Sequence, residues 1–153
     1  MCMKKRLLIT VISAGMLSCH SNQADQPAPE VDSADTAPVM VWEAGMDDST
    51  GNLSMKKQES DLDSLSGPAL AQYLSNEHIK LEFTRISHDT VFIRIPDATY
   101  LTENMGSTGA MQRMAAYVYN FTELPGIHFV NFDFEEGDHA APGTYNRDSF
   151  KNE

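Results

Sequence analysis

The clearest pattern in this chain is a helical repeat of apolar residues in its second half. Within residues 109–121, four apolar side chains recur at i, i+3, i+4 and i+7, the spacing of one helix face; they are Met111, Met114, Ala115 and Val118. Leu124-Pro125-Gly126 follows and ends a helix, because proline lacks the amide N–H and glycine allows the chain to reverse. The pattern therefore predicts a main helix over residues 108–123.

Alternation of apolar and polar residues predicts strands on both sides of this helix. Apolar residues alternate in three segments, which are Ile79, Leu81 and Phe83, then Val91, Ile93 and Ile95, and finally Val130, Phe132 and Phe134. Ser87-His88-Asp89 has the length and chemistry of a hairpin turn between the first two segments. The last segment follows the main helix directly, so we expect it to pack beside the helix.

Two further elements complete the predicted fold. A proline at its first turn favours a short helix over residues 68–75, and residues 39–44 and 52–59 are a candidate strand pair. We therefore expect an α+β fold, in which one small domain over residues 39–136 has a mixed sheet with the two helices packed on it. The polar residues 137–153 are expected to form a frayed C-terminal tail.

Residues 1–18 have the pattern of an export signal. A basic start precedes an apolar run that is too short to span a bilayer and that ends near Cys19. The pattern resembles a bacterial lipoprotein signal, in which Cys19 is lipidated and anchors the chain to a membrane. An ordinary secretory signal cut near Ser18 or Ser21 is the alternative. Residues 19–38 are rich in proline, alanine, serine and acids, which is the composition of a solvated tether.

Charge and cysteine content narrow the class of protein. The chain has 11 basic and 22 acidic residues and a formal net charge of −11. Such a surface repels phosphate backbones, so we expect no nucleic-acid binding. Both cysteines, Cys2 and Cys19, lie near the start of the chain, and the globular part therefore has none with which to form a disulfide. The translation start is open between Met1 and Met3.

With the elements in order, residues 39–136 resemble the GerMN domain of spore-germination and sporulation proteins and of many envelope lipoproteins, and the specific part of the resemblance covers residues 91–134. The resemblance is carried by Ile93-Arg94-Ile95-Pro96-Asp97 with Leu101-Thr102, by Gly106-Ser107-Thr108-Gly109, and by the segment from Tyr119 to Gly126. It implies an extracytoplasmic module that contacts the cell wall or an envelope protein. It implies no catalytic residues, and the domain alone implies no link to sporulation.

The densest group of candidate metal ligands follows the last predicted strand. It consists of Asp133, Glu135, Glu136, Asp138 and His139. Carboxylate oxygens on a loop suit Ca²⁺, but the spacing is not that of an EF-hand, and one histidine is too few for a typical zinc site. We therefore expect a solvated acidic strand end, with metal binding as the alternative.

The start of the main helix is a candidate anion site. N–H groups and hydroxyls of Ser107, Thr108 and Gly109 could hold a carboxylate or phosphate there. The segment lacks the lysine and the length of a phosphate-binding loop. Ser107 or Thr108 acting as the helix N-cap explains the same residues, and we predict this capping role.

The remaining patterns give no catalytic motif. The five histidines are scattered singly, and no nucleophile motif is present, so we expect neither an enzyme nor a cofactor. Trp42 or Tyr100 is a candidate aromatic contact for a sugar, and burial of these rings is an equal alternative. Asn120-Phe121-Thr122 matches a glycosylation sequon by letter, which we interpret as a coincidence.

These patterns favour an acidic, membrane-anchored lipoprotein of the bacterial cell envelope, exposed to the periplasm or at the cell surface. Its expected partners are the membrane, through the lipid on Cys19, and a cell-wall glycan or an envelope protein. Two alternatives stay open. One is a small metal-dependent hydrolase that uses the acidic residues 133–139. The other is a structural subunit of an envelope assembly that pairs through its sheet edges.

Overall fold

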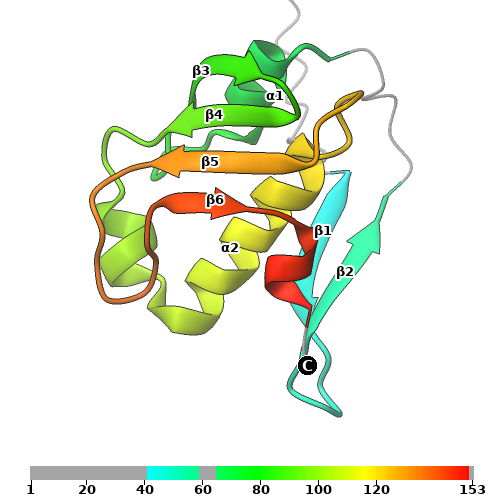
Figure 1. The fold of residues 1–153 in the computed structure, drawn as a ribbon. Helices are drawn as coiled ribbons and strands as arrows, with labels where there is room; N and C mark the ends of the chain where they lie inside the picture. Colours follow the sequence, from blue (N-terminus) through cyan, green and yellow to red (C-terminus); the bar gives the residue numbers. More distant parts are fainter. Residues whose placement is uncertain (1–40, 59–64, 152–153) are drawn as a thin grey trace, which may run out of the picture. The chain divides into compact units, whose positions relative to one another are not determined.

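A computed structural model describes residues 41–58 and 65–151 of the chain. The predicted signal and tether over residues 1–38, including Cys19, lie outside the described residues. Within the described part, the chain forms a four-stranded sheet, a separate two-stranded sheet and several helices (Figure 1). None of the helices in this part is both long and apolar enough to cross a membrane.

The four-stranded sheet has the strand order β3-β4-β5-β6. Its strands are β3 (Glu82–Ser87), β4 (Thr90–Arg94), β5 (Phe129–Asp133) and β6 (Gly143–Tyr145). β4 and β5 are parallel, with Val91 opposite Val130 and Ile93 opposite Phe132, whereas both outer pairs are antiparallel. The prediction of a mixed sheet in an α+β fold is therefore confirmed.

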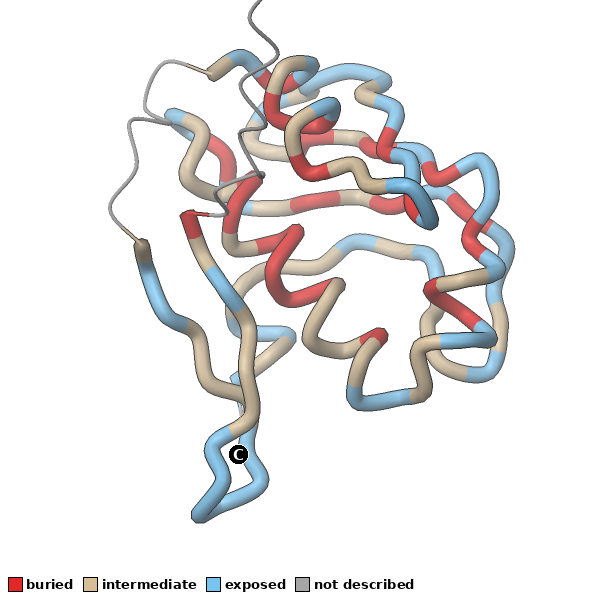
Figure 2. The backbone as a smooth tube through the Cα atoms, turned by 180° about the vertical axis from the view of Figure 1, so that it is seen from behind, coloured by how far each residue is buried: buried red, intermediate tan, exposed pale blue. Residues whose placement is uncertain are grey.

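The parallel pair is connected through the main helix, α2 (Gly106–Phe121), which covers one face of the sheet (Figure 1). The buried core joins residues of α2 with residues of β4 and β5, among them Met114, Tyr117, Val118, Phe121, Val91, Ile93, Val130 and Phe132. Figure 2 shows this concentration of buried positions along the helix and the facing strands. α2 starts two residues earlier and ends two residues earlier than the helix predicted over residues 108–123.

One position of the predicted helix stripe differs from expectation. Met111 is only half-buried, whereas Ala116 and Asn120 are buried. The two-stranded sheet explains this difference, because β1 (Trp42–Met46) lies beside Ala116 and Asn120 and is paired antiparallel to β2 (Leu53–Lys57). α2 is therefore buried both against the four-stranded sheet and against the hairpin.

Two short helices complete the core. The short helix α1 (Gly67–Leu74) starts one residue before the predicted range, with Ser66 as its N-cap, and it buries Leu70 and Leu74. A π-helix, η2 (Tyr100–Asn104), connects β4 to α2. Both helices contribute side chains to the same core cluster as the sheet and α2.

The C-terminal segment belongs to the fold, and the prediction of a frayed tail over residues 137–153 is wrong for residues 143–151. β6 adds to the sheet beside β5, and a 3₁₀ helix, η3 (Arg147–Phe150), follows it. The ring centre of Tyr145 lies 6.1 Å from that of Phe132 and 5.9 Å from that of Phe150. These aromatic contacts pack β6 and η3 against the core.

Candidate functional site

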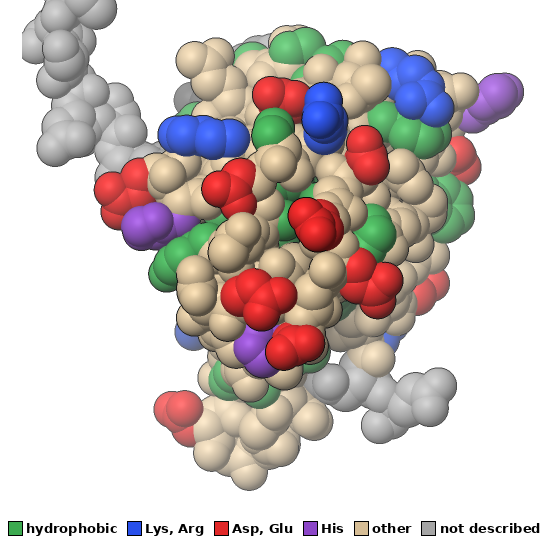
Figure 3. Space-filling model, turned by 90° about the vertical axis from the view of Figure 1, so that its left-hand side faces the viewer, with side chains coloured by type: hydrophobic (Ala, Val, Ile, Leu, Met, Phe, Trp, Pro, Cys, Tyr) green, Lys and Arg blue, Asp and Glu red, His purple; other side chains and the backbone are tan. Residues whose placement is uncertain are grey.

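The five candidate metal ligands do not form one cluster in the structure. Glu135 and Glu136 line a cavity of about 210 Å³ together with Asp97 and Glu103, whereas Asp133 is exposed at the end of β5. Figure 3 shows acidic side chains gathered on one face of the molecule. Among the described residues, no group of three or more His, Cys, Asp or Glu side chains could hold a metal ion.

His139, the fifth predicted ligand, contacts a residue of the other candidate site instead. Its Nδ1 lies 3.2 Å from Oγ of Ser107, and its backbone N–H donates to the carbonyl of Thr102 at 3.0 Å. These contacts join the loop after β5 to η2 and to the first turn of α2. Within the described residues no carboxylate bonds to His139, so the serine–histidine pair lacks the acid that orients the histidine of a catalytic triad.

The prediction that Ser107 or Thr108 caps the main helix is wrong. Both residues are exposed inside the first turn of α2, and the cap position is held by Met105, which makes no side-chain cap bond. Gly106 has φ of 69°, in the left-handed region that glycine enters without steric cost. η2 and Met105 before this glycine already have a helical backbone, and the chain changes direction at Gly106. The helix therefore starts without an extended capping residue.

A charged and aromatic cluster lies at the C-terminal end of α2, and the sequence patterns did not predict it. Glu123 accepts hydrogen bonds from Nε1 of Trp42 at 2.8 Å, from Nζ of Lys57 at 2.9 Å and from Nη2 of Arg147. Arg147 also donates from Nε to Oγ1 of Thr122 at 2.7 Å. The β1–β2 hairpin, the end of α2 and η3 therefore meet at one carboxylate. We call these five residues the Glu123 cluster.

The charge of Glu123 is stabilised by this arrangement. Partial burial raises the pKa of its carboxyl group, but hydrogen bonds from Lys57, Arg147 and Trp42 lower the pKa more, to about 2. The guanidinium of Arg147 also lies 5.2 Å from the ring centre of Trp42 and 5.0 Å from that of Tyr119, within the range of cation–π attraction. The cluster is therefore an ion-pair network packed on aromatic rings.

The two candidate aromatic contacts for a sugar, Trp42 and Tyr100, both pack against other side chains. Trp42 meets the ring of Tyr119 edge-on, with ring centres 5.2 Å apart. Tyr100 stacks on His78, with ring centres 4.3 Å apart and planes inclined by 16°. Both rings therefore have packing partners within the fold.

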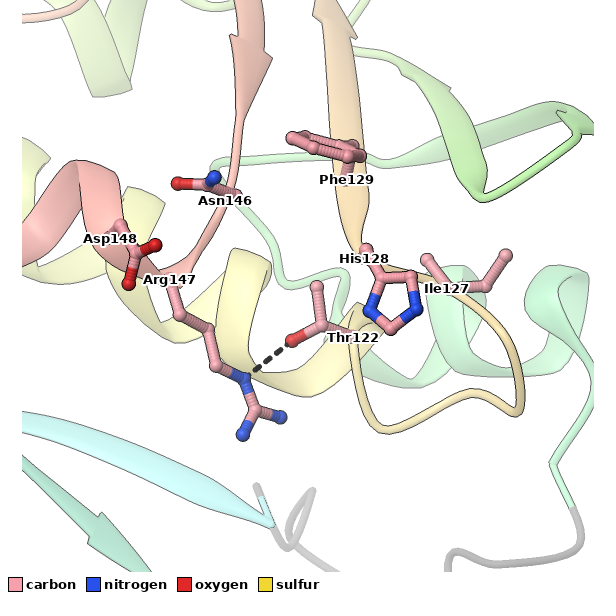
Figure 4. Close-up of a pocket in the computed structure, with 7 residues that line it drawn as sticks. All are labelled: Thr122, Ile127, His128, Phe129, Asn146, Arg147 and Asp148. Atoms are coloured by element: carbon pink, nitrogen blue, oxygen red, sulfur yellow. Dashed lines mark hydrogen bonds between the residues drawn. The ribbon is translucent and has the colours of Figure 1, made fainter.

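A cavity of about 310 Å³ lies beside the Glu123 cluster (Figure 4). We call it the β5–η3 cavity, and its lining residues are Thr122, Ile127, His128, Phe129, Asn146, Arg147 and Asp148. They come from the end of α2, from the start of β5 and from η3 with the residue before it. Its volume is at the lower end of the range of small-molecule sites, about 300–1,000 Å³.

The charged groups of the β5–η3 cavity are already paired. Arg147 forms an ion pair with Glu123, and Asp148 forms one with Nζ of Lys151 at 2.5 Å. A ligand that enters the cavity therefore meets compensated charges. Over the whole sequence, by contrast, acidic residues outnumber basic ones two to one.

Uncharged groups supply the remaining chemistry of the cavity. Asn146 uses Oδ1 to accept the N–H of Ser149 at 3.0 Å, and its Nδ2 has no partner among the described residues. His128 is exposed, so its ring nitrogens are accessible, and Phe129 is half-buried and offers an apolar ring. The cavity thus combines donors and acceptors with one aromatic surface.

The β5–η3 cavity and the Glu123 cluster adjoin each other and share Thr122 and Arg147. Their residues are scattered along the sequence, and no motif spacing links them. Comparisons of the chain with protein-family models, with curated proteins and with solved structures gave no match. The resemblance to the GerMN domain therefore stays a prediction from the sequence.

Proposed function

We propose that this chain is a non-catalytic, GerMN-like binding module of the bacterial cell envelope, and that its β5–η3 cavity binds a neutral, hydroxyl-rich ligand such as a cell-wall sugar unit. The observation that carries this proposal is the pairing of both charged residues in a polar cavity. A charged ligand is bound best by an unpaired opposite charge, whereas hydroxyl groups need only positioned donors and acceptors.

The groups available for hydroxyls lie on both sides of the cavity. Asn146 offers Nδ2 as a donor, His128 offers one donor and one acceptor when neutral, and Asp148 keeps the carboxylate oxygen that Lys151 does not bind. Phe129 provides an apolar surface for the ring carbons of a sugar. This mixture of one apolar surface and a few directed polar groups is typical of small-ligand sites.

Binding to the wall is tested with the mature chain, residues 19–153, carrying Cys19→Ser so that it stays soluble. The protein is incubated with isolated cell-wall sacculi, and the fraction that sediments with them is measured. We expect His128→Ala combined with Asp148→Ala to weaken binding roughly tenfold, because two hydrogen-bonding groups are lost. Gln72→Ala, exposed on α1, is the control and should bind like the parent. Equal sedimentation of the double variant and the parent contradicts the proposal.

The envelope location rests on the sequence of residues 1–38. A lipid on Cys19 would hold the module at a membrane, and the tether over residues 19–38 would allow a reach on the order of 25 Å. Cys19→Ala in cells should release the chain into the soluble fraction after cell lysis. A variant that stays tightly bound to membranes contradicts the lipid anchor, independently of the sacculus result.

A further inference from the structure

The edge of β1 that faces α2 carries backbone groups that do not pair with β2. In an antiparallel pair, the N–H and C=O groups of successive residues point alternately toward the partner strand and away from it. Val41 and Asp47 form backbone bonds across the hairpin. Trp42, Ala44 and Met46 therefore point their N–H and C=O groups away from β2.

Asn120 of α2 occupies the first of these three positions. Its Oδ1 accepts the N–H of Trp42 at 3.2 Å, and its Nδ2 donates to the carbonyl of Trp42 at 3.0 Å. The side-chain amide thus pairs with Trp42 as the peptide group of a neighbouring strand would. Ala44, two residues after Trp42, has no such partner among the described residues. The edge of β1 is therefore open at Ala44.

A cavity of about 190 Å³ lies at this open position. β1 contributes Glu43 and Ala44 to its lining, and the helix contributes four residues at i, i+3, i+4 and i+7, which are Gly109, Gln112, Arg113 and Ala116. Gly109 and Ala116 are small and leave the space unfilled. Asn120 lies on the same face of the helix, one turn after Ala116. The cavity is therefore part of a groove between β1 and α2, and Asn120 closes this groove at Trp42.

Arg113 gives this groove an unpaired positive charge. Its guanidinium lies 5.9 Å from the ring centre of Tyr117, and the described residues provide it with no ion-pair partner. A guanidinium binds a carboxylate through two parallel hydrogen bonds, which fixes both position and direction. The groove therefore combines an open strand edge with a carboxylate-binding group.

We propose that the groove between β1 and α2 binds the C-terminal end of an extended peptide from another protein. The peptide adds to the open edge of β1 at Ala44 and Met46, and its terminal carboxylate binds Arg113. This site lies apart from the β5–η3 cavity and takes a ligand of another class.

The edges of the four-stranded sheet are less suited to such pairing. β3 has a register shift between Phe83 and Arg85, and β6 has three residues. Bulges and short strands are the features that blunt an edge against strand addition. Of the β1, β3 and β6 edges, the β1 edge is therefore the one best suited to a partner strand.

The proposal is tested by NMR on the isotope-labelled mature chain carrying Cys19→Ser. The probes are a pool of random hexapeptides with free C-terminal carboxylates and the same pool with amidated C-termini. We expect the free-carboxylate pool to shift the amide signals of Ala44 and Met46 in a saturable way. The amidated pool should bind roughly tenfold more weakly, because the charge-assisted bonds to Arg113 are lost.

Two variants separate the carboxylate contact from a general effect. Arg113→Gln should bind both pools equally, while Arg94→Gln, an exposed arginine at the end of β4, should keep the preference of the parent. The proposal is overturned if Ala44 and Met46 do not respond at millimolar peptide, or if the parent binds both pools equally. It is also overturned if their signals change on dilution of the protein alone, which indicates a second copy in the groove. A change on deletion of residues 20–40 overturns it as well, since the chain's own segment then fills the groove.

Discussion

Tyr117 places a hydroxyl group in the core without a hydrogen-bond partner among the described residues. The residue is 0 % exposed. Burial raises the pKa of its hydroxyl group to about 12, although the charge of Arg113 acts in the opposite direction. A buried hydroxyl that has lost water without gaining a bond costs about 1–3 kcal/mol. The ring therefore stabilises the core, and its oxygen opposes that gain.

Tyr117→Phe should raise the free energy of unfolding by about 1 kcal/mol, because the ring stays and the unpaired oxygen is removed. Urea unfolding measures the change. Tyr145→Phe is the matched control, since the hydroxyl of Tyr145 donates to the carbonyl of Ala141 at 2.7 Å, and its loss should lower stability by about 1 kcal/mol. If the two variants lose stability equally, the hydroxyl of Tyr117 has a partner and the expectation is wrong.

Glu123 makes the stability of the fold depend on pH. Its pKa is lowered from 4.5 to about 2 in the folded protein, so its ion pairs contribute fully above about pH 4.5 and their contribution is lost as the pH falls toward 2. Glu123→Gln should cost on the order of 1 kcal/mol at pH 7, since solvent screens a partly exposed pair. At pH 2.5 the cost should be clearly smaller.

Urea unfolding of Glu123→Gln and of the parent at both pH values checks this expectation. Glu82→Gln, an exposed change on β3, controls for removing any one carboxylate and should leave the stability difference close to zero at both values. A cost for Glu123→Gln that does not change with pH would show that the carboxyl group acts through its shape alone.

At the scale of elements, the β1–β2 hairpin depends on Asn120 for its position. Asn120→Ala removes both bonds to the backbone of Trp42 and a third bond from Nδ2 to the carbonyl of Ala116 at 2.7 Å. We expect a loss of about 1–3 kcal/mol and a red-shifted emission, because Trp42 is the only tryptophan and reports on docking of the hairpin.

Fluorescence together with urea unfolding measures this effect. Asn131→Ala is the control, since Asn131 donates to Oγ1 of Thr144 at the surface, and it should leave the emission maximum unchanged. An Asn120→Ala protein with the emission of the parent would mean that packing of the tryptophan ring alone holds the hairpin.

Periodicity predicted some elements well and misplaced others for identifiable reasons. β4 and β5 follow their alternation, because their apolar residues face one helix. Ile79 and Leu81 continue the same alternation and are buried, yet β3 begins only at Glu82. Their N–H groups donate instead to Oδ1 of Asn76 and to Oγ of Ser75. Side chains thus replace the strand ladder, and alternation alone cannot reveal that.

The candidate site could not be predicted for a different reason. Its central bond joins Arg147 to Glu123 across 24 residues, and its cavity needs η3, which has no apolar period long enough to detect. Tyr145 and Phe150 were the available signal, since two aromatic residues in a polar segment favour burial. The helix cap was predicted where the structure has none. Ser107 and Thr108 are residue types that often cap helices, but the π-helix η2 leads directly into α2, so no capping side chain is needed.

At the scale of the whole described chain, both ends of the folded part meet at Glu123. Lys57 reaches it from the N-terminal hairpin and Arg147 from the C-terminal η3. Truncation after Gly137 removes β6 and η3 and uncovers Phe132, which is 1 % exposed in the intact protein. We expect the truncated chain to lose its cooperative unfolding transition.

Circular dichroism during urea titration measures this loss. A chain that ends at Lys151 is the control and should unfold like the full protein, since it keeps β6 and η3. If the chain that ends at Gly137 unfolds cooperatively with unchanged stability, residues 143–151 are not required for the fold and the expectation is wrong.

The bonds of Asn120 also bear on the choice of expression host. Asn120-Phe121-Thr122 is a sequon that a eukaryotic secretory pathway can modify while the chain is still extended. The sugar would be attached to Nδ2, the atom that bonds to Trp42 and Ala116, at a residue that is 1 % exposed in the folded protein. A chain glycosylated there cannot close its hairpin onto α2, so such hosts should yield misfolded glycoprotein while bacterial hosts yield the native fold.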